Sequence, residues 1–328
     1  MEHGDFDEPF IRRGFGDGAG GGLRSCREYP VYTNNYKFSA LAIFGSMSYK
    51  AKRLWGWEML QCGVEWRPTL VKRVIEPLRT STRAAKVATD EGIGFLKGMG
   101  NPAGPVALAT ELVAAELARW LGLKTPPFAI VQLVDLDVPM IERGYMLHGP
   151  AFISKEIDGL TADGGDVFLS RLHNPEDISK LVVFDTWIRN ADRCPPDPQN
   201  TPYNRDNLFF TPSGRKFQIV VFDHSHCFVE GTLEDELGQP HLLDDERIYG
   251  NFPEFSAYIR PDAVQAAVAR LRQIDTNVVQ EVLGSIPQQW GISGSIKAAW
   301  CHLICARANK VAEFIPGKLL DEPGLCLE

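Results

Sequence analysis

The sequence lacks the features that define several classes of protein. Its 328 residues contain no apolar run near the roughly 18 residues that cross a bilayer. The first residues are acidic and no apolar segment followed by small residues comes after them, so we expect no secretory signal peptide. The 7 cysteines are scattered and form no Cys-x-x-Cys pair, which argues against a disulfide framework and against a structural zinc site. We therefore expect a soluble, cytoplasmic protein.

Positive charge is also scarce. The chain has 34 Lys and Arg against 42 Asp and Glu, a net charge of −8. Non-specific binding of nucleic acid needs basic surface that displaces counterions, so we expect no direct nucleic-acid contact. The 44% hydrophobic content is ample for a sizeable core. At roughly 150 residues per domain, the length predicts two lobes or one domain with an appendage.

Both ends of the chain differ from its middle. The glycine-rich run 16–22 fits Gly-x-Gly-x-x-Gly on paper, but no strand precedes it and no apolar helix follows it directly. We interpret it as part of a low-complexity tail. Residues 31–66 have no clear periodicity beyond a short helix around 37–60. We therefore treat 1–66 as a tail and N-terminal extension, and 321–328 as a C-terminal tail.

Regular structure is predicted from Thr69 onward, because apolar and β-branched residues recur at strand or helix spacing. The predicted strands cover residues 69–76, 84–88, 93–97, 128–134 and 217–222, and another apolar strand begins after Asn207. The predicted helices cover residues 106–121, 178–189, 262–274 and 296–314. The first half is thus strands, one helix and a strand, while the second half is more helical.

Three polar side chains in the second half point to chemistry. Asp192 follows a predicted helix, Asn207 precedes an apolar strand, and Asp223 follows another strand. Oxygen ligands at 207 and 223 suit a hard cation such as Mg²⁺, and Asp192 could then accept the proton of an attacking hydroxyl. This is the division of labour of kinases. Asp and Asn also dominate turns, but all three in this order, each at the end of an apolar element, favour a shared site.

A second pair lies upstream. Lys97 ends a predicted strand and Glu111 lies in the first turns of the next helix. A strand lysine held by a helix glutamate, and reaching nucleotide phosphates, is the arrangement in kinases. Taken alone, Lys97 would be a solvated charge and Glu111 a helix acid matched to the dipole. The kinase interpretation of this pair depends on the site residues at 192–223.

Other polar clusters near these residues have simpler explanations. His224, His226 and Cys227 invite a metal interpretation, but adjacent residues of a strand point to opposite faces and remote ligands are absent. We therefore favour no zinc there. The arginines near the catalytic loop could contact phosphate or a carboxylate, or could pair with Asp185 or Asp206, and both alternatives stay open. These arginines are Arg189, Arg193 and Arg205.

Residues from about 67 to 315 resemble the HipA-like kinases and, more distantly, the type II phosphatidylinositol kinases. The resemblance rests on Phe95-Leu-Lys97, on the helix from Thr110-Glu111 to Gly122, on Asn190-Ala-Asp192-Arg193, on Asp206-Asn207-Leu, on Phe222-Asp223-His224 and on the late Pro-Gln-Gln-Trp290. The string Asn-x-Asp-Arg, Asp-Asn-Leu and Asp-His is specific, and the helix match is softer.

The resemblance implies an α+β, bilobal protein-kinase-like fold that binds ATP between the lobes. It implies a small N-lobe (67–150) with an antiparallel sheet and one helix, and a mainly helical C-lobe (151–320). Asp192 would be the catalytic acid/base. Asn207 and Asp223 would hold Mg²⁺, and Lys97 would bind phosphate with Glu111 as its partner. By position alone, residues 152–156 would connect the lobes.

The chain also departs from the family pattern. The loop after the first strand, residues 78–84, contains no glycine, although glycine lets backbone amides approach phosphate most closely. Nucleotide binding there would be weaker, or would depend on the hydroxyls of Ser81 and Thr82. A proline-rich insert lengthens the spacing from Asp192 to Asn207 and could shape substrate choice, and Ser225 stands where the family tends to have glycine.

The sequence favours a Ser/Thr protein kinase of this kind and leaves two alternatives. The acceptor could instead be a phosphoinositide or a small-molecule hydroxyl, although no basic amphipathic helix supports a lipid. The glycine-free loop would also suit a pseudokinase or nucleotide-binding scaffold, which the complete set of site residues opposes. The family includes kinase toxins held by a DNA-binding antitoxin, so an antitoxin-like or regulatory protein is an implied partner.

Overall fold

We describe the protein from a computed structural model, which places residues 60–161, 167–197 and 202–320. These residues belong to one compact unit, Lys52–Glu328. The glycine-rich run 16–22, the expected helix around 37–60 (except Leu60) and the tail 321–328 lie outside the described residues. Within the described ranges, no helix is both long and apolar enough to span a membrane.

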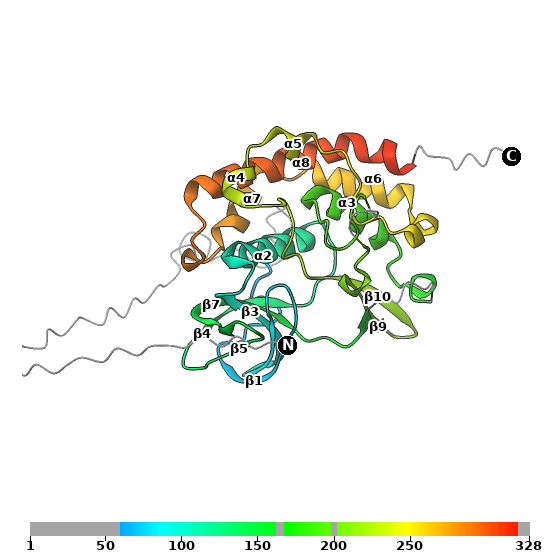
Figure 1. Cartoon of the computed structure of the whole chain (residues 1–328). Helices are drawn as coiled ribbons and strands as arrows, with labels where there is room; N and C mark the ends of the chain where they lie inside the picture. Colours follow the sequence, from blue (N-terminus) through cyan, green and yellow to red (C-terminus); the bar gives the residue numbers. More distant parts are fainter. Residues whose placement is uncertain (1–59, 162–166, 198–201, 321–328) are drawn as a thin grey trace, which may run out of the picture. The chain divides into compact units, whose positions relative to one another are not determined.

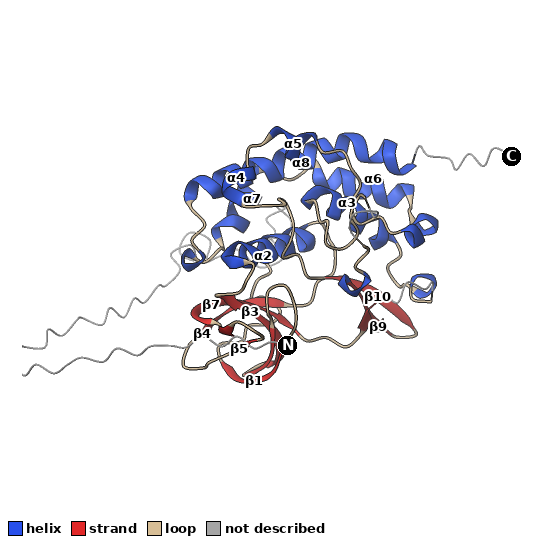
Figure 2. Cartoon of the chain, in the orientation of Figure 1, coloured by secondary structure: helices blue, strands red, loops and turns tan. Residues whose placement is uncertain are grey.

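A five-stranded antiparallel sheet forms the first lobe (Figures 1 and 2). Its strands, in spatial order, are β1 (Val71–Pro77), β2 (Ala85–Thr89), β3 (Gly92–Met99), β7 (Leu147–Lys155) and β4 (Phe128–Leu133). A two-stranded ribbon, β5 (Pro139–Met140) with β6 (Gly144–Tyr145), lies between β4 and β7 in sequence. The strands predicted at 69–76, 84–88, 93–97 and 128–134 are confirmed.

Strand β7 was not predicted, and it changes two expectations about the lobes. Residues 152–155, expected as part of a connector, are paired with β3 and β4 at the centre of the sheet. Only Glu156 of that segment lies beyond the strand. The sheet also continues past the predicted lobe boundary at 150. Apolar and polar residues do not alternate clearly in this strand, because all side chains from Pro150 to Ile153 are buried, whichever face of the sheet they are on.

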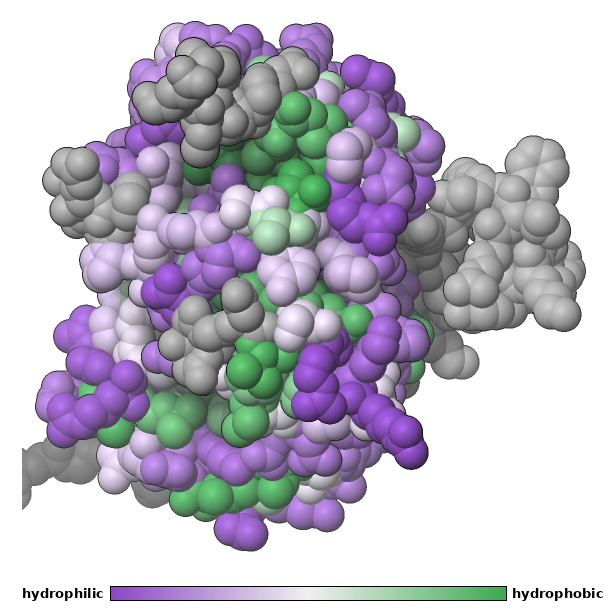
Figure 3. Space-filling view, turned by 90° about the vertical axis from the view of Figure 1, so that its right-hand side faces the viewer, coloured by the Kyte–Doolittle hydropathy of each residue, from purple (hydrophilic) through white to green (hydrophobic). Residues whose placement is uncertain are grey.

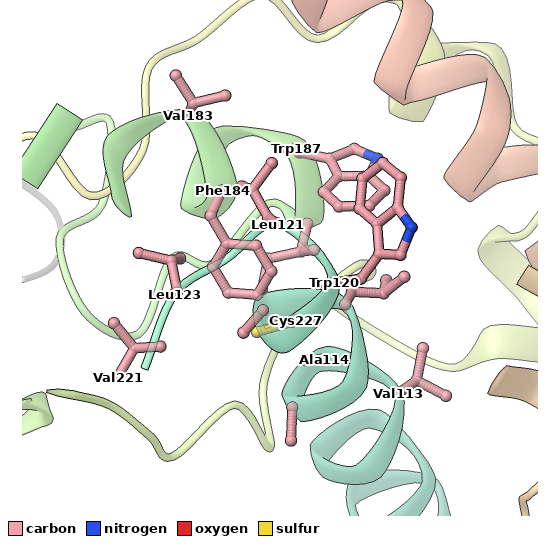
Figure 4. Close-up of a cluster of buried hydrophobic side chains, with 14 of the residues drawn as sticks. Val113, Ala114, Trp120, Leu121, Leu123, Val183, Phe184, Trp187, Val221 and Cys227 are labelled. Atoms are coloured by element: carbon pink, nitrogen blue, oxygen red, sulfur yellow. The ribbon is translucent and has the colours of Figure 1, made fainter. Parts of the chain in front are cut away.

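Helix α2 (Gly104–Trp120) contacts the sheet on one side and the helices of the second lobe on the other (Figure 1). Almost every side chain from Ala107 onward is buried, which explains why its sequence is apolar all round. At its C-terminal end, Trp120 and Leu121 meet Phe184 and Trp187 (Figure 4). The two tryptophan rings are 6.0 Å apart. The helix predicted at 106–121 is therefore a central part of the core.

The second lobe is mainly helical, as expected (Figure 2). Its helices are α3 (Glu176–Ile188), α4 (Leu233–Glu236), α5 (Pro240–Asp244), α6 (Pro261–Leu271), α7 (Thr276–Gly284) and α8 (Gly294–Leu320), with short 3₁₀ turns at Leu169–Arg171, Arg205–Asn207, Pro253–Tyr258 and Gln288–Trp290. A small sheet has the order β10 (Lys216–Val221), β9 (Leu208–Ser213), β8 (Leu160–Thr161). The predicted helices at 178–189, 262–274 and 296–314 and the strand at 217–222 are confirmed; α7 was not predicted.

The two lobes are joined through buried polar contacts as well as through apolar packing. The indole Nε1 of Trp290 donates to the carbonyl oxygen of Pro150 in β7 at 2.9 Å. Trp290 is buried, so this contact fixes the second lobe against the sheet. It gives a structural reason for the Pro-Gln-Gln-Trp segment that carried part of the family resemblance.

The face of the molecule drawn in Figure 3 is mostly hydrophilic. Figure 3 shows one face on which hydrophobic residues form separate patches among hydrophilic ones. The exposed large hydrophobic side chains of the described residues include Val134, Tyr145, Leu147, Leu160 and Val167. Scattered side chains of this kind are normal for a folded protein.

Candidate active site

A lysine and a glutamate from adjacent elements form a buried ion pair. The Lys97 Nζ of β3 donates to the Glu111 Oε2 of α2 at 2.6 Å. Glu111 is buried and the Lys97 side chain is 12% exposed. Lys97 is held by the sheet pairing of β3 with β7, and Glu111 by a helix that is buried all round. The two elements therefore fix the position of the ammonium group.

Asp223 joins this pair from the end of β10. Its Oδ1 accepts a hydrogen bond from Lys97 Nζ at 2.8 Å. Asp223 has a φ of 57°, in the left-handed region that non-glycine residues rarely adopt. Such conformations persist where the surrounding structure imposes them, and they cluster at functional sites. Here the conformation lets the chain leave the strand while the carboxylate turns toward Lys97.

Ser225 completes a four-membered network. Its hydroxyl donates to Glu111 Oε2 at 2.7 Å and accepts from Lys97 Nζ at 2.9 Å. The residue is buried. The backbone N–H of His224 also donates to Glu111, at 3.1 Å to Oε2. The segment after Asp223 is thereby fastened to the ion pair by two groups, the Ser225 hydroxyl and the His224 N–H. A glycine, which the family tends to have at position 225, would have no hydroxyl to make these hydrogen bonds.

Burial and charge act in opposite directions on this network. Burial lowers the pKa of Lys97, but the adjacent carboxylates of Asp223 and Glu111 outweigh that effect and hold the pKa above its usual value. Burial raises the pKa of Asp223, but the charge and the hydrogen bond of Lys97 lower this pKa by more. The net pKa of Asp223 therefore lies below its usual value. The ammonium and the carboxylate are both charged at neutral pH.

Asp192 and Asn207 form a second pair close to this network. Asp192 follows α3 after a left-handed residue, Arg189, which ends the helix at a φ of 54°. Asn207 stands immediately before β9. The Asn207 Nδ2 donates to Asp192 Oδ2 at 3.0 Å. Because the amide nitrogen faces Asp192, the amide oxygen is the atom left to face a cation, and it is a ligand type that a hard cation prefers.

Arg193 connects several segments of this site through its buried side chain. Its side chain is fully buried and forms an ion pair with Asp185, which also accepts from Asn190 Nδ2 at 3.0 Å. It also donates to the backbone oxygens of Asn207 at 3.1 Å and Phe222 at 2.9 Å. One guanidinium thus fixes the backbone of one candidate cation ligand, Asn207, and of the residue before the other, Asp223. Of the two alternatives for Arg193, the structure shows pairing with Asp185.

The other arginines are structural too, but their partners differ from those expected. Arg189 pairs with Asp245 at 2.9 Å, and Arg205 pairs with Glu254 at 2.8 Å. Both acids are distant in sequence, so neither pairing could be read from local spacing. Burial and the nearby Arg193 charge lower the pKa of His224 well below its usual value, so the imidazole is neutral. The described residues contain no group of three or more His, Cys, Asp or Glu side chains that could hold a metal ion.

An aromatic cavity opens beside the Lys97 network. Its volume is about 390 Å³ and its walls include Phe95, Phe128, Phe152, Phe209 and Phe222. Lys97, Glu111 and Asp223 line one part of it. A concave, mostly apolar cavity with a few placed charged groups is the usual form of a small-molecule site. The aromatic lining suits an aromatic ring with an anionic group placed near the lysine.

The loop between β1 and β2 contributes to this cavity differently from the expectation. Thr80 lines it, whereas Ser81 and Thr82 do not. Thr82 is buried, and the Ser81 hydroxyl lies 2.9 Å from Nε2 of His226. The Thr80 hydroxyl accepts from the Ala84 N–H at 2.9 Å and closes the turn. The hydroxyl-bearing side chains of this tight, glycine-free turn therefore point in different directions. The amino-acid composition of the loop could not have predicted this.

The comparisons with known proteins agree with this geometry. The family model described as HipA-like kinase matches residues 80–319. The chain belongs to the HipA-like kinase family. No curated protein matches its sequence significantly.

Solved structures show that this HipA-like kinase shares the fold of other kinases. The Helicobacter pylori proinflammatory kinase CtkA is similar with a TM-score of 0.50 at 14% identity, over 78% of this chain and 98% of that chain. HipA in the Shewanella oneidensis complex of HipA, HipB and operator DNA matches at a TM-score of 0.35 and 10% identity, over 84% of this chain and 72% of that chain. The similarity to CtkA confirms the kinase-like fold, and the match to the family model confirms a kinase activity.

The sequence had singled out most of the residues that meet here. Lys97, Glu111 and Asp223 form one network, and Asp192 with Asn207 forms the adjacent pair. The aromatic walls and Thr80 were missed. The aromatic residues alternate with apolar ones in ordinary strands, and nothing in such a pattern separates a cavity wall from a core position.

Proposed function

We propose that this HipA-like kinase transfers the γ-phosphate of ATP, with Mg²⁺, to a serine or threonine hydroxyl of a protein. The observation that carries the proposal is the Lys97 ammonium, which bridges Glu111 and Asp223 at 2.6 and 2.8 Å on the wall of an aromatic cavity. Catalysis of phosphoryl transfer depends on positioned charge more than on covalent chemistry. A buried, prearranged ammonium beside a carboxylate supplies such charge.

The remaining residues suit the other roles that the reaction needs. The oxygens of Asn207 and Asp223 would hold Mg²⁺, and the ion would neutralise charge on the phosphates. Asp192 would accept the proton of the attacking hydroxyl. The amide of Asn207 donates to Asp192 at 3.0 Å, so the proposed proton acceptor and a proposed cation ligand are hydrogen-bonded to each other. The aromatic cavity would hold the adenine ring between apolar side chains.

The proposal is tested by intact mass after incubation of the purified protein with Mg-ATP. We expect added phosphate on the wild type or on a serine peptide supplied with it, and none with Asp192→Asn. The matched control is Asp262→Asn, which removes the same charge from an exposed position at the start of α6. It should transfer phosphate like the wild type. Transfer by Asp192→Asn at the wild-type rate would contradict the assigned role.

Thermal shift separates this proposal from a scaffold that binds no nucleotide. A ligand present at about 100 times its Kd stabilises the folded state by roughly 2.7 kcal/mol. We expect Mg-ATP to raise the Tm of the wild type and of Asp192→Asn alike, because Asp192 does not line the aromatic cavity. No shift with either protein would contradict nucleotide binding.

A further inference from the structure

A second cavity lies next to the aromatic one and shares no lining residue with it. Its volume is about 420 Å³. Helix α2 lines both cavities, with Glu111 and Ala115 at the first and with Val106 and Thr110 at the second. The segment after β10 likewise lines the first with Asp223 and the second with Ser225. The boundary between the two cavities therefore passes through the candidate catalytic network.

Asp192 lines this second cavity and not the first. A group that accepts a proton must lie within hydrogen-bond reach of the hydroxyl that loses it. The nucleotide is assigned to the aromatic cavity, where Lys97 and Asp223 are. The hydroxyl that Asp192 serves must therefore enter from the second cavity. This step rests on the proposed function.

The charged side chains around the second cavity are mainly acidic. Asp192, Glu230 and Glu234 line it. The one arginine in its lining, Arg189, has a side chain that is only 2% exposed, and it is bound by Asp245 at 2.9 Å and by the Phe228 carbonyl at 2.8 Å. That positive charge is already compensated by the protein. The amino end of α2 at Ala103 adds only the partial charge of a helix dipole.

Glu230 and Glu234 are well placed to interact with an acceptor. The Glu230 side chain is 72% exposed, although its Oε1 lies 3.3 Å from Arg189 and 3.7 Å from Arg247. Arg247 is not among the residues that line the cavity. Glu234 is exposed in the short helix α4. Complementary charge of this kind determines which partner binds more than how tightly it binds.

We propose that the second cavity is the acceptor site and that it takes a chain segment with lysine or arginine next to the phosphorylated hydroxyl. The volume is that of a cleft for a few residues of extended chain or loop, within the usual range of ligand sites. A segment rich in Asp or Glu would meet like charge at Asp192, Glu230 and Glu234. Glu230 and Glu234 are thus specificity residues for a cationic acceptor.

Peptide binding tests this inference without needing catalysis. Two fluorescent peptides that share one serine, flanked either by arginines or by glutamates, are titrated with the protein, Mg²⁺ and a non-hydrolysable ATP analogue, and anisotropy is measured at low salt. We expect the arginine peptide to bind at least about tenfold more tightly, because exposed pairs are each worth a fraction of 1 kcal/mol and several act together. The preference should shrink as salt screens the charges.

Three variants locate the effect. Glu234→Lys should reduce the ratio of the two affinities by about threefold or more, and Glu230→Gln should also reduce it. The control Glu313→Lys makes the same change of net charge as Glu234→Lys at an exposed position of α8 that lines neither cavity. It should leave the ratio unchanged. Equal affinities in the wild type, or an equal effect of Glu313→Lys, would overturn the inference.

The outcome also separates this inference from the proposed function. Transfer of phosphate to both peptides with equal kcat/KM would overturn the acceptor assignment and leave the kinase intact. Selective binding of the arginine peptide through Glu234, with no transfer to any hydroxyl, would contradict the phosphotransferase and leave the cavity assigned to cationic segments. Selective binding and selective transfer support both.

Discussion

Replacement of Arg193 by methionine probes the hub of the site. The side chain is fully buried, and the change removes the ion pair with Asp185 together with the hydrogen bonds to the Asn207 and Phe222 carbonyls. Methionine has a similar length and an unbranched, adaptable shape, so it fills much of the space. What remains is a buried carboxylate without its counter-charge and two carbonyl groups without a donor.

The expected cost follows from this burial. Removal of one partner of a buried ion pair costs about 3–5 kcal/mol, because the other charge is left uncompensated. The total stability of a domain is about 5–15 kcal/mol, so the loss is a large fraction of it. For a chain of this size each kcal/mol shifts Tm by roughly 2–4 °C. We therefore expect Arg193→Met to lower Tm by roughly 6–20 °C.

Urea denaturation provides the assay, with Arg205→Met as the matched control. The pair between Arg205 and Glu254 is partly exposed, with 32% of the arginine side chain accessible. Such pairs contribute about 0–1 kcal/mol, so the control should lose little stability. Both variants remove one arginine from the same part of the chain. The pairs differ in their burial and in the bonds of Arg193 to backbone oxygens, while Arg205 also lies over the rings of Tyr203 and Phe252 at 5.3 and 5.6 Å.

A double-mutant cycle contains the result that would refute the reasoning. If the cost of Arg193→Met arises from the orphaned Asp185 carboxylate, then Asp185→Leu in the same chain removes that charge. The double variant should be destabilised by at least about 1 kcal/mol less than the sum of the two single changes. If the stability losses of the two single variants simply add in the double variant, Arg193 and Asp185 are not coupled. If Arg205→Met loses as much stability as Arg193→Met, burial of the ion pair does not determine the loss.

Three further predictions concern the Lys97 network and the cavity wall. Ser225→Ala should weaken Mg-ATP binding by about tenfold in calorimetry, because a hydrogen bond to a charged group contributes about 1.5–3 kcal/mol; unchanged affinity would contradict its role. The lowered pKa of Asp223 means that its stabilisation is present above its ordinary pKa of about 4 and is lost as pH falls through the lower pKa of the folded state, so Lys97→Met should cost most at pH 7 and progressively less as pH falls below about 4 in urea denaturation. Gly159→Ala should lower Tm and nucleotide affinity together, because its new Cβ would lie 2.5 Å from the Phe210 oxygen; wild-type behaviour in either measurement would count against a rigid wall.

The chemistry-bearing residues could be predicted because each stands at a distinctive place in the chain. Asp192, Asn207 and Asp223 each stand just beyond an apolar helix or beside an apolar strand, and polar residues at such ends are few. Lys97 and Glu111 could be predicted from the resemblance and from a strand followed by a helix. The sequence pattern indicates that these residues share a site. The structure brings them within hydrogen-bond distance as two sets, Lys97 with Glu111 and Asp223, and Asp192 with Asn207.

The connections around the site could not be predicted, because they join residues far apart in sequence. Arg189 has two acids close by in the chain but pairs with Asp245, 56 residues away. The hydroxyls of Ser81 and Thr82 were expected at the nucleotide, but the turn directs neither side chain into the cavity. A turn of a few residues has several closed forms, and the direction of each side chain depends on which hydrogen bond closes it.

By itself, the sequence determined most of the helices and strands and the identity of the polar residues at their ends, because periodicity and chain order are local properties, and its resemblance to the HipA-like kinases implied the α+β class. The tertiary structure alone decided that β7 lies at the centre of the sheet, that Ser225 joins Lys97 and Glu111, and that Asp192 faces an acidic cavity distinct from the aromatic one. These features depend on packing between distant segments. No local pattern encodes such packing, since burial and the direction of a side chain are set by neighbours that the chain supplies many residues later.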